Sequence, residues 1–183
     1  MKRHITIALF VAVFSFVIAP LTAQAIGINL VVQWKGTGTA GVLPPGVGGD
    51  VVPVGTECVI VEMVDPRTGL SLGTGYDCIV DMTPVGHGGD GIKVTTYYIF
   101  AFKDGSIISL NSLTVQPVVD QGSIDVGMTH ILGDFLFVDE NSIQGGTKRF
   151  YNATGNVRVS GGVNLNNFPD TIEFDDLFVI TLE

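Results

Sequence analysis

Residues 94–112 read VTTYYIFAFKDGSIISLNS, and this stretch decides the fold class. Apolar and polar side chains alternate along it on both sides of Asp104-Gly105, a dipeptide typical of two-residue turns because both turn residues take positive φ. Alternation with a period of two is the pattern of a strand, whose successive side chains point to opposite faces. The sequence therefore predicts a tight antiparallel hairpin here.

The first strand of this hairpin has an aromatic face, made of Val94, Thr96, Tyr98, Phe100 and Phe102. We expect this face to point into the core or the lumen of the domain. Aromatic stripes on strands usually pack in a core, although a barrel of about eight strands also has room for one small ligand. Tyr98 and Phe100 are therefore candidate ligand-binding residues, with core packing as the alternative.

Short apolar runs separated by glycine-rich or polar turns recur along the whole chain, and no long stretch shows the 3.6-residue spacing of an amphipathic helix. Strands are expected at 28–34, 57–64, 71–82, 94–103, 106–115, 128–138, 147–160 with an internal break, and 171–182. Such a set fits a sandwich or a closed barrel, and closure removes the open edges that invite aggregation. The predicted fold class is all-β, and the strand pattern alone leaves the choice between a sandwich and a barrel open.

Two glycine-rich stretches are expected to be loops. Residues 35–55 contain Pro44-Pro45-Gly46 and Gly48-Gly49, which predicts a long, mobile surface loop. Residues 86–91, GHGGDG, lack the Lys-Ser/Thr ending and the following helix of a phosphate-binding loop. They are interpreted as a connection between strands.

The N-terminus has the three parts of a secretory signal peptide. Lys2 and Arg3 precede an apolar run over 5–19, and Ala23-Gln24-Ala25 supplies the small residues that signal peptidase needs. The run is shorter than the roughly 20 residues of a membrane-spanning helix. We expect residues 1–25 to be a cleaved signal and residues 26–183 to form one domain, secreted or periplasmic, without a membrane span.

The charge balance excludes some classes of partner. The chain has 9 Lys and Arg against 18 Asp and Glu, a formal net charge of −9, which becomes about −11 when Lys2 and Arg3 leave with the signal. Nucleic acids and anionic membranes require basic patches, so neither is expected as a partner. His87 and His130 have no second ligand at metal-binding spacing, and the sequence predicts no metal site and no cofactor.

The two cysteines, Cys58 and Cys78, are predicted to form a disulfide. Asp65-Pro66-Arg67-Thr68-Gly69 has the composition of a turn, and a hairpin centred on Thr68 brings residue 58 opposite residue 78. An even number of cysteines in an oxidising compartment favours a bond. Two buried reduced cysteines are the alternative.

The same register pairs two candidate catalytic residues. Cys58, Ile60 and Glu62 share a face with Tyr76 and Cys78, whereas Val59, Val61 and Met63 face the other way together with Gly73, Gly75, Asp77 and Ile79. If the Cys58 face lines the barrel, Glu62 lies near Tyr76 in an apolar cavity, where burial raises the pKa of the acid and suits it to proton transfer. The alternative is that Glu62 faces water. By the same alternation, Arg158 is expected on the exterior.

The segment GGTKRFYNATGNVRVSG at 145–161 resembles the Gly-Gly-Thr-x-x-Phe, then Ala-x-Gly, signature of the allene oxide cyclase and dirigent barrel superfamily. It follows an expected strand with a polar turn at Asp139-Glu140 and precedes one last apolar strand, as in that superfamily. The resemblance implies a single antiparallel, eight-stranded, calycin-like β-barrel. Independently of the family, Gly155 in this segment permits a bulge or a close backbone contact inside a strand, and Phe150 is expected to be a core plug.

Members of that superfamily share a fold more than a function, so the resemblance carries no catalytic residue to this chain. Three hypotheses follow. The barrel binds or conformationally steers a small hydrophobic molecule in its lumen; or it is an isomerase or cyclase with an ionisable group in that lumen; or it is a structural barrel that self-associates as a dimer or trimer.

Overall fold

The protein is described here by a computed structural model covering residues 27–84, 91–117, 128–135 and 141–183, with the backbone alone at 116–117 and 128–135. The expected signal peptide, His87, most of the glycine-rich segment at 86–91 and the turn at Asp139-Glu140 lie outside the described residues, as does the side chain of His130. In the part of the chain that is described, no helix has the length and hydropathy needed to span a bilayer.

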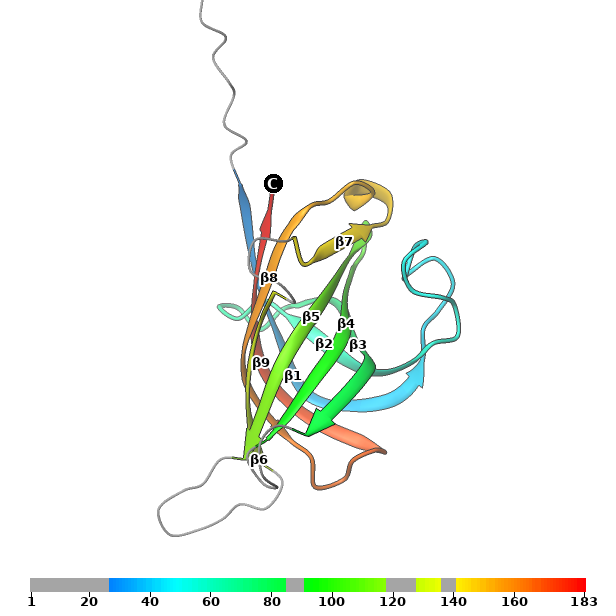
Figure 1. Cartoon of the computed structure of the whole chain (residues 1–183). Coiled ribbons are helices and arrows are strands. Elements are labelled where there is room, and N and C mark those ends of the chain that lie inside the picture. The colour runs from blue at the N-terminus through cyan, green and yellow to red at the C-terminus, as the bar shows by residue number, and fades with distance from the viewer. Residues whose placement is uncertain (1–26, 85–90, 118–127, 136–140) are drawn as a thin grey trace, which may run out of the picture.

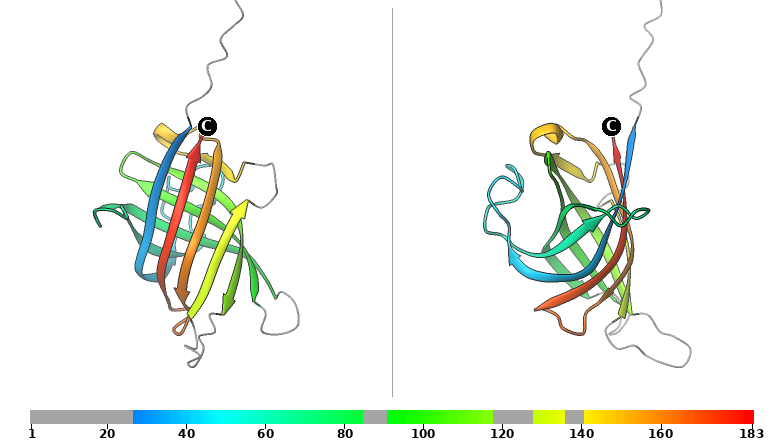
Figure 2. Two further views of the ribbon diagram at one scale, coloured as in Figure 1. Left: turned by 90° about the vertical axis from the view of Figure 1, so that its left-hand side faces the viewer. Right: turned by 180° about the vertical axis from the view of Figure 1, so that it is seen from behind.

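The chain folds into an all-β barrel. Its strands are β1 (Ile28–Val42), β2 (Glu57–Val64), β3 (Ser71–Pro84), β4 (Ile92–Phe102), β5 (Gly105–Pro117), β6 (Met128–Phe135), β7 (Ile143–Gly146), β8 (Gly155–Asn164) and β9 (Thr171–Leu182). All pairings are antiparallel, in the order β4-β3-β2-β1-β9-β8-β6-β5-β7, and β4 also pairs with β5. Eight strands thus form a closed ring, with β7 attached to β5 (Figures 1 and 2). The predicted antiparallel eight-stranded barrel is confirmed.

The predicted hairpins are present, with one difference in turn geometry. Phe102 pairs with Gly105, so the turn between β4 and β5 consists of Lys103 and Asp104. Gly105 has a φ of 144°, whereas Asp104 does not adopt positive φ, contrary to the expected turn. Between β2 and β3 the carboxylate of Asp65 accepts hydrogen bonds from the backbone N–H groups of Arg67 and Thr68, at 2.8 and 3.0 Å. Such local acceptor bonds are the reason that Asp favours turns.

The loop expected at 35–55 is shorter than predicted. β1 runs to Val42, because residues 35–39 pair with the first half of β9 and residues 39–42 pair with β2. The remaining loop curls back beside the outside of the barrel (Figure 1). Its residues Leu43 and Val52 are buried. They pack in a second core cluster with Tyr76, Cys58, Cys78, Ile99 and Ile108. The glycines and prolines therefore shape a packed cover, which composition alone did not indicate.

Cys58 and Cys78 form the predicted disulfide inside this outer cluster. The register of β2 and β3 is the predicted one, since Val59 pairs with Asp77 and Ile60 with Tyr76. The two Cα atoms are 4.1 Å apart, slightly closer than the usual range of about 4.4–6.8 Å. The bond links two neighbouring strands on the exterior face, beneath the loop.

The segment after β7 closes one end of the barrel. A short 3₁₀ turn, η1 (Lys148–Phe150), buries Phe150 against Phe102, with ring centroids 5.6 Å apart. Gly155, with a φ of 126°, lies so close to β9 that a Cβ atom would be 2.0 Å from the carbonyl oxygen of Thr181. The expected core plug and close backbone contact are both confirmed.

Side chains complete the wall where β6 ends. There Asn111 of β5 donates a hydrogen bond from Nδ2 to the carbonyl oxygen of Val157 in β8, at 2.8 Å. The N–H of Val157 donates to Oγ of Ser142, at 2.7 Å. Asn111 and Ser142 are both buried, and these bonds satisfy the backbone N–H and C=O of Val157 beyond the last described pair of β6 and β8, Gly133 with Val159.

Candidate functional site

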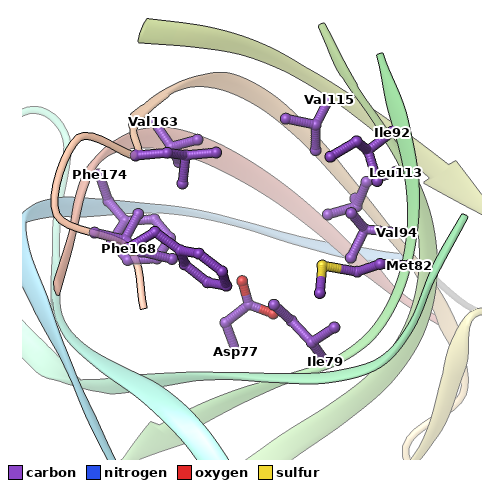
Figure 3. A pocket seen from close by; sticks show the side chains of 12 residues that line it. Asp77, Ile79, Met82, Ile92, Val94, Leu113, Val115, Val163, Phe168 and Phe174 are labelled. Atoms are coloured by element: carbon purple, nitrogen blue, oxygen red, sulfur yellow. The ribbon is translucent and has the colours of Figure 1, made fainter. Parts of the chain in front are cut away.

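A cavity of about 130 Å³ lies at the end of the barrel opposite Phe150 (Figure 3). It is formed where β3 and β5 end, where β4 and β9 begin, and where the chain turns from β8 into β9. Its lining is apolar except for one acid: Asp77, Ile79, Met82, Ile92, Val94, Leu113, Val115, Val163, Leu165, Phe168, Ile172 and Phe174. A hollow of this composition suits a small hydrocarbon group beside a single polar contact.

Asp77 places a carboxylate at the inner side of this cavity. β3 turns its side chain inward on the same face as Gly73 and Gly75, and Figure 3 shows the carboxylate directed into the hollow. Thr96 of β4 donates a hydrogen bond from its hydroxyl to Oδ1 of Asp77. Burial raises the pKa of Asp77 to about 6, against the opposing effect of the Thr96 hydrogen bond, which favours the charged form.

Asp176 of β9 is a second interior acid, also shielded from solvent. Burial raises its pKa to about 8, and the negative charges of Asp77 and Asp175 add to that effect. Room for its carboxylate comes from Gly161 of β8, where a Cβ atom would be 2.3 Å from Oδ1 of Asp176. Within the described part of the chain, that oxygen has no hydrogen-bond partner.

Aromatic side chains fill the middle of the barrel. Trp34 contacts four rings, at centroid distances of 5.1 Å to Tyr98, 5.6 Å to Phe100, 5.9 Å to Phe174 and 4.5 Å to Phe178. The aromatic face of β4 points inward as expected. Tyr98 and Phe100, the predicted ligand-binding residues, belong to this packed cluster and do not line the cavity. The interior is therefore solid at its centre, and the cavity lies beyond this packed cluster.

Tyr98 is a third ionisable group of the interior, and both acids act on its pKa. Burial raises the pKa of Tyr98 well above its ordinary value, and the charges of Asp77 and Asp176 raise it further. Tyr98 pairs with Asp77 across β3 and β4. Three ionisable groups from three strands thus share the interior beside the cavity.

An open groove of about 610 Å³ adjoins the cavity on the outer side of the same barrel end. Asp77, Ile79, Met82 and Phe168 line both hollows, so the groove leads to the buried carboxylate. Phe168 and Met82 are exposed and form an apolar rim. The groove also carries the acids Glu57 and Asp170.

The pairing of Glu62 with Tyr76 in a lumen, which required the Cys58 face to be interior, is not formed, and the alternative that Glu62 faces water is the one observed. The register is as expected, but the Cys58 face lies outside the barrel, and the Val59 face lies inside. Glu62 is exposed to solvent, and Tyr76 packs in the outer cluster with the disulfide, where burial raises its pKa. The indole of Trp34 lies against Gly75 on the inner face, where a Cβ atom would be 2.3 Å from Cε2 of Trp34. Arg158 is exposed, as predicted.

Neither interior acid was proposed as a site residue from the sequence, although alternation contains the signal for both. Asp77 shares a face with Gly75 and Ile79, which was the alternative interior face. Asp176 is in phase with the apolar residues of β9: Ile172, Phe174, Phe178 and Ile180. An acid in phase with a buried face is the pattern that marks such sites.

Among the described residues, no group of three or more His, Cys, Asp or Glu side chains is arranged to hold a metal ion. Comparison with known proteins adds no relative: no protein-family model, no curated protein and no solved structure matches the chain. The geometry of the cavity and its acids is therefore what indicates a function.

Proposed function

We propose that this protein binds a small apolar molecule in the cavity at the open end of its barrel. The observation that carries the proposal is the lining: a hollow of about 130 Å³ with apolar walls and one buried carboxylate. An engineered apolar cavity of about 150 Å³ in another protein holds benzene, so this volume suits a ring or branched chain of that size. A longer ligand extends past Phe168 into the groove.

The test is a cavity-filling substitution. Val163→Phe places a ring in the hollow, whereas Val179→Phe enlarges an exposed side chain on the outside of β9 and serves as the matched control. Benzene-sized probes are titrated into each protein by calorimetry, and native mass spectrometry is run on material purified from its own host. We expect binding by the wild type and by Val179→Phe and none by Val163→Phe. Equal binding by all three proteins places the ligand elsewhere and refutes the proposal.

A second candidate is an isomerase or cyclase of the allene oxide cyclase type, and the observation that favours it is Asp77. Its pKa of about 6 lies near neutrality, where a carboxyl group can both give and take a proton. The apolar wall would hold a flexible substrate in one conformation while Asp77 acts on its polar atom. Product chirality measured with wild type and Asp77→Asn tests this. A racemic product from the wild type contradicts it.

Self-association is the third candidate. Val31 of β1 and Val179 of β9 are cross-strand partners on the barrel exterior, both exposed, and Leu177 is exposed on the same side of β9. This apolar strip offers a face for a dimer or trimer. Light scattering on wild type and Val179→Lys measures the oligomeric state, and a monomeric wild type at micromolar concentration removes the candidate.

Export is proposed together with these functions. The Cys58–Cys78 disulfide supports an oxidising compartment, because such bonds persist in secreted and periplasmic proteins. Cell fractionation and N-terminal sequencing test it. A mature chain that starts at Ile26 is expected, whereas an uncleaved cytoplasmic chain contradicts it.

A further inference from the structure

Both hollows at the open end of the barrel carry acids and no base. Asp77 lines the cavity, Asp77, Glu57 and Asp170 line the groove, and Asp176 lies deeper. Every Lys and Arg in the described ranges is exposed, and none lines either hollow. Walls of low dielectric constant strengthen the electric field of these negative charges, so the path to Asp77 attracts cations.

Asp77 is arranged as a hydrogen-bond acceptor. The Thr96 hydroxyl donates to Oδ1, and that bond stabilises the charged form of the carboxylate. Burial raises the pKa of Asp77 to about 6 and that of Asp176 to about 8, so Asp77 is the acid of the two that ionises more readily. The other groups that act on this pair are Tyr98 from β4 and Asp175 from β9.

The charge on Asp77 has lost most of its contact with water, since the residue is 8% exposed. A neutral apolar ligand removes the remaining water from the cavity and leaves the carboxylate with less solvation. An ammonium group instead supplies a counter-charge and a charge-assisted donor at the same place. Folding has already removed most of the water around Asp77, so its charge is buried in the free and in the ligand-bound protein. A bound cation therefore stabilises that charge without a further desolvation cost for the acid.

We infer that the ligand is a lipophilic amine bound as its cation, with its hydrocarbon part in the cavity and its ammonium against the Asp77 carboxylate. This inference rests on the proposed ligand-binding function and specifies its chemical class. The cavity volume limits the hydrocarbon part to about the size of a benzene ring. Glu57 and Asp170, at the mouth, increase the local concentration of the cation.

The experiment compares benzylamine with its neutral isosteres benzyl alcohol and toluene, and with benzoate, by calorimetry on the disulfide-bonded protein. At about pH 7.5 we expect benzylamine to bind at least about tenfold tighter than benzyl alcohol and benzoate not to bind. Benzylamine affinity should fall as the pH is lowered to about 5, because Asp77 takes up a proton while the amine stays charged. Toluene affinity should change little over that range.

Asp77→Asn should abolish the preference for benzylamine over benzyl alcohol and keep toluene binding, whereas Asp170→Asn at the rim should reduce the preference only slightly. Equal affinities of the wild type for amine and alcohol, or a preference that survives Asp77→Asn, refute the amine inference but leave the ligand-binding proposal intact. If none of the four compounds binds, the ligand-binding proposal itself fails. The wild-type pH profile supplies a test that does not depend on any variant folding.

Discussion

Trp34 of β1 and Asp176 of β9 are cross-strand partners whose side chains both point into the barrel. Each holds a buried polar atom, Nε1 of Trp34 and Oδ1 of Asp176, that has no hydrogen-bond partner among the described residues. Neighbouring glycines make room for both side chains, Gly75 for the indole and Gly161 for the carboxylate. Two polar atoms without partners among the described residues are thus enclosed in a largely apolar core, with consequences for stability that can be measured.

Stability should decline as the pH rises from about 4 to about 8. The folded-state pKa values of Asp77 and Asp176, about 6 and about 8, both exceed the unfolded value near 3.8. When the pKa of an acid is higher in the folded than in the unfolded state, its contribution to the free energy of unfolding is complete below the unfolded-state pKa. That contribution is lost as the pH rises through the folded-state pKa. Asp176→Asn should remove up to about 1.4 kcal/mol of that decline per pH unit. Urea unfolding across this pH range measures it.

The control for this prediction is Asp175→Asn, which neutralises the neighbouring exposed carboxylate. It should leave most of the pH dependence in place, because Asp175 only adds to the effect of burial on Asp176. Parallel stability curves for wild type and Asp176→Asn would mean that Asp176 is not a high-pKa acid in the folded protein.

Gly75→Ala should destabilise the barrel by about 3 kcal/mol or more. A Cβ atom at this position would be 2.3 Å from Cε2 of Trp34 and 2.5 Å from Nε1, so the indole or the strand has to move. Gly27→Ala is the matched control, since its nearest neighbour would be 3.4 Å away. Denaturant midpoints compare the two variants, with the fluorescence of the single tryptophan as the probe. Equal midpoints contradict the packing described for Trp34.

Removing the disulfide with Cys58→Ser and Cys78→Ser should lower the free energy of unfolding by up to about 3 kcal/mol, the chain-entropy value for a loop of about 20 residues. The barrel should still fold, because the ring of strand pairings does not depend on that bond. Thermal unfolding with and without reductant measures the loss. Two alkylatable thiols in the untreated native protein would show that the bond is not formed, and complete unfolding on reduction would show that the ring needs it.

Asn111→Leu should cost about 1–3 kcal/mol, although the two side chains have similar shapes. The substitution leaves the carbonyl of Val157 and the hydroxyl of Ser109 without the bonds that Asn111 makes to them. Asn164→Leu, in the partly exposed end of β8, is the control and should change stability by less. An Asn111→Leu variant with an unchanged free energy of unfolding would mean that β5 and β8 do not need this link where β6 ends.

The sequence was sufficient for the fold class, the register of the β2–β3 hairpin and the disulfide, because these depend on local information. Alternation sets which residues share a face, and the turn at Asp65 sets the register that brings Cys58 opposite Cys78. The close packing of Gly155 and the burial of Phe150 also follow from local motif chemistry. All of these features need only short-range periodicity and turn preferences.

Which face points inward was decided only by the tertiary structure. Both faces of the β2–β3 hairpin are apolar enough to be buried, and both are buried in part: one around Trp34 in the barrel, the other beneath the loop with Leu43 and Val52. That choice depends on contacts between β1 and β3 and between the loop and β4, which no local pattern encodes. It moved the candidate acid from Glu62 to Asp77, because a change of face along a strand exchanges every side chain between the inside and the outside of the barrel.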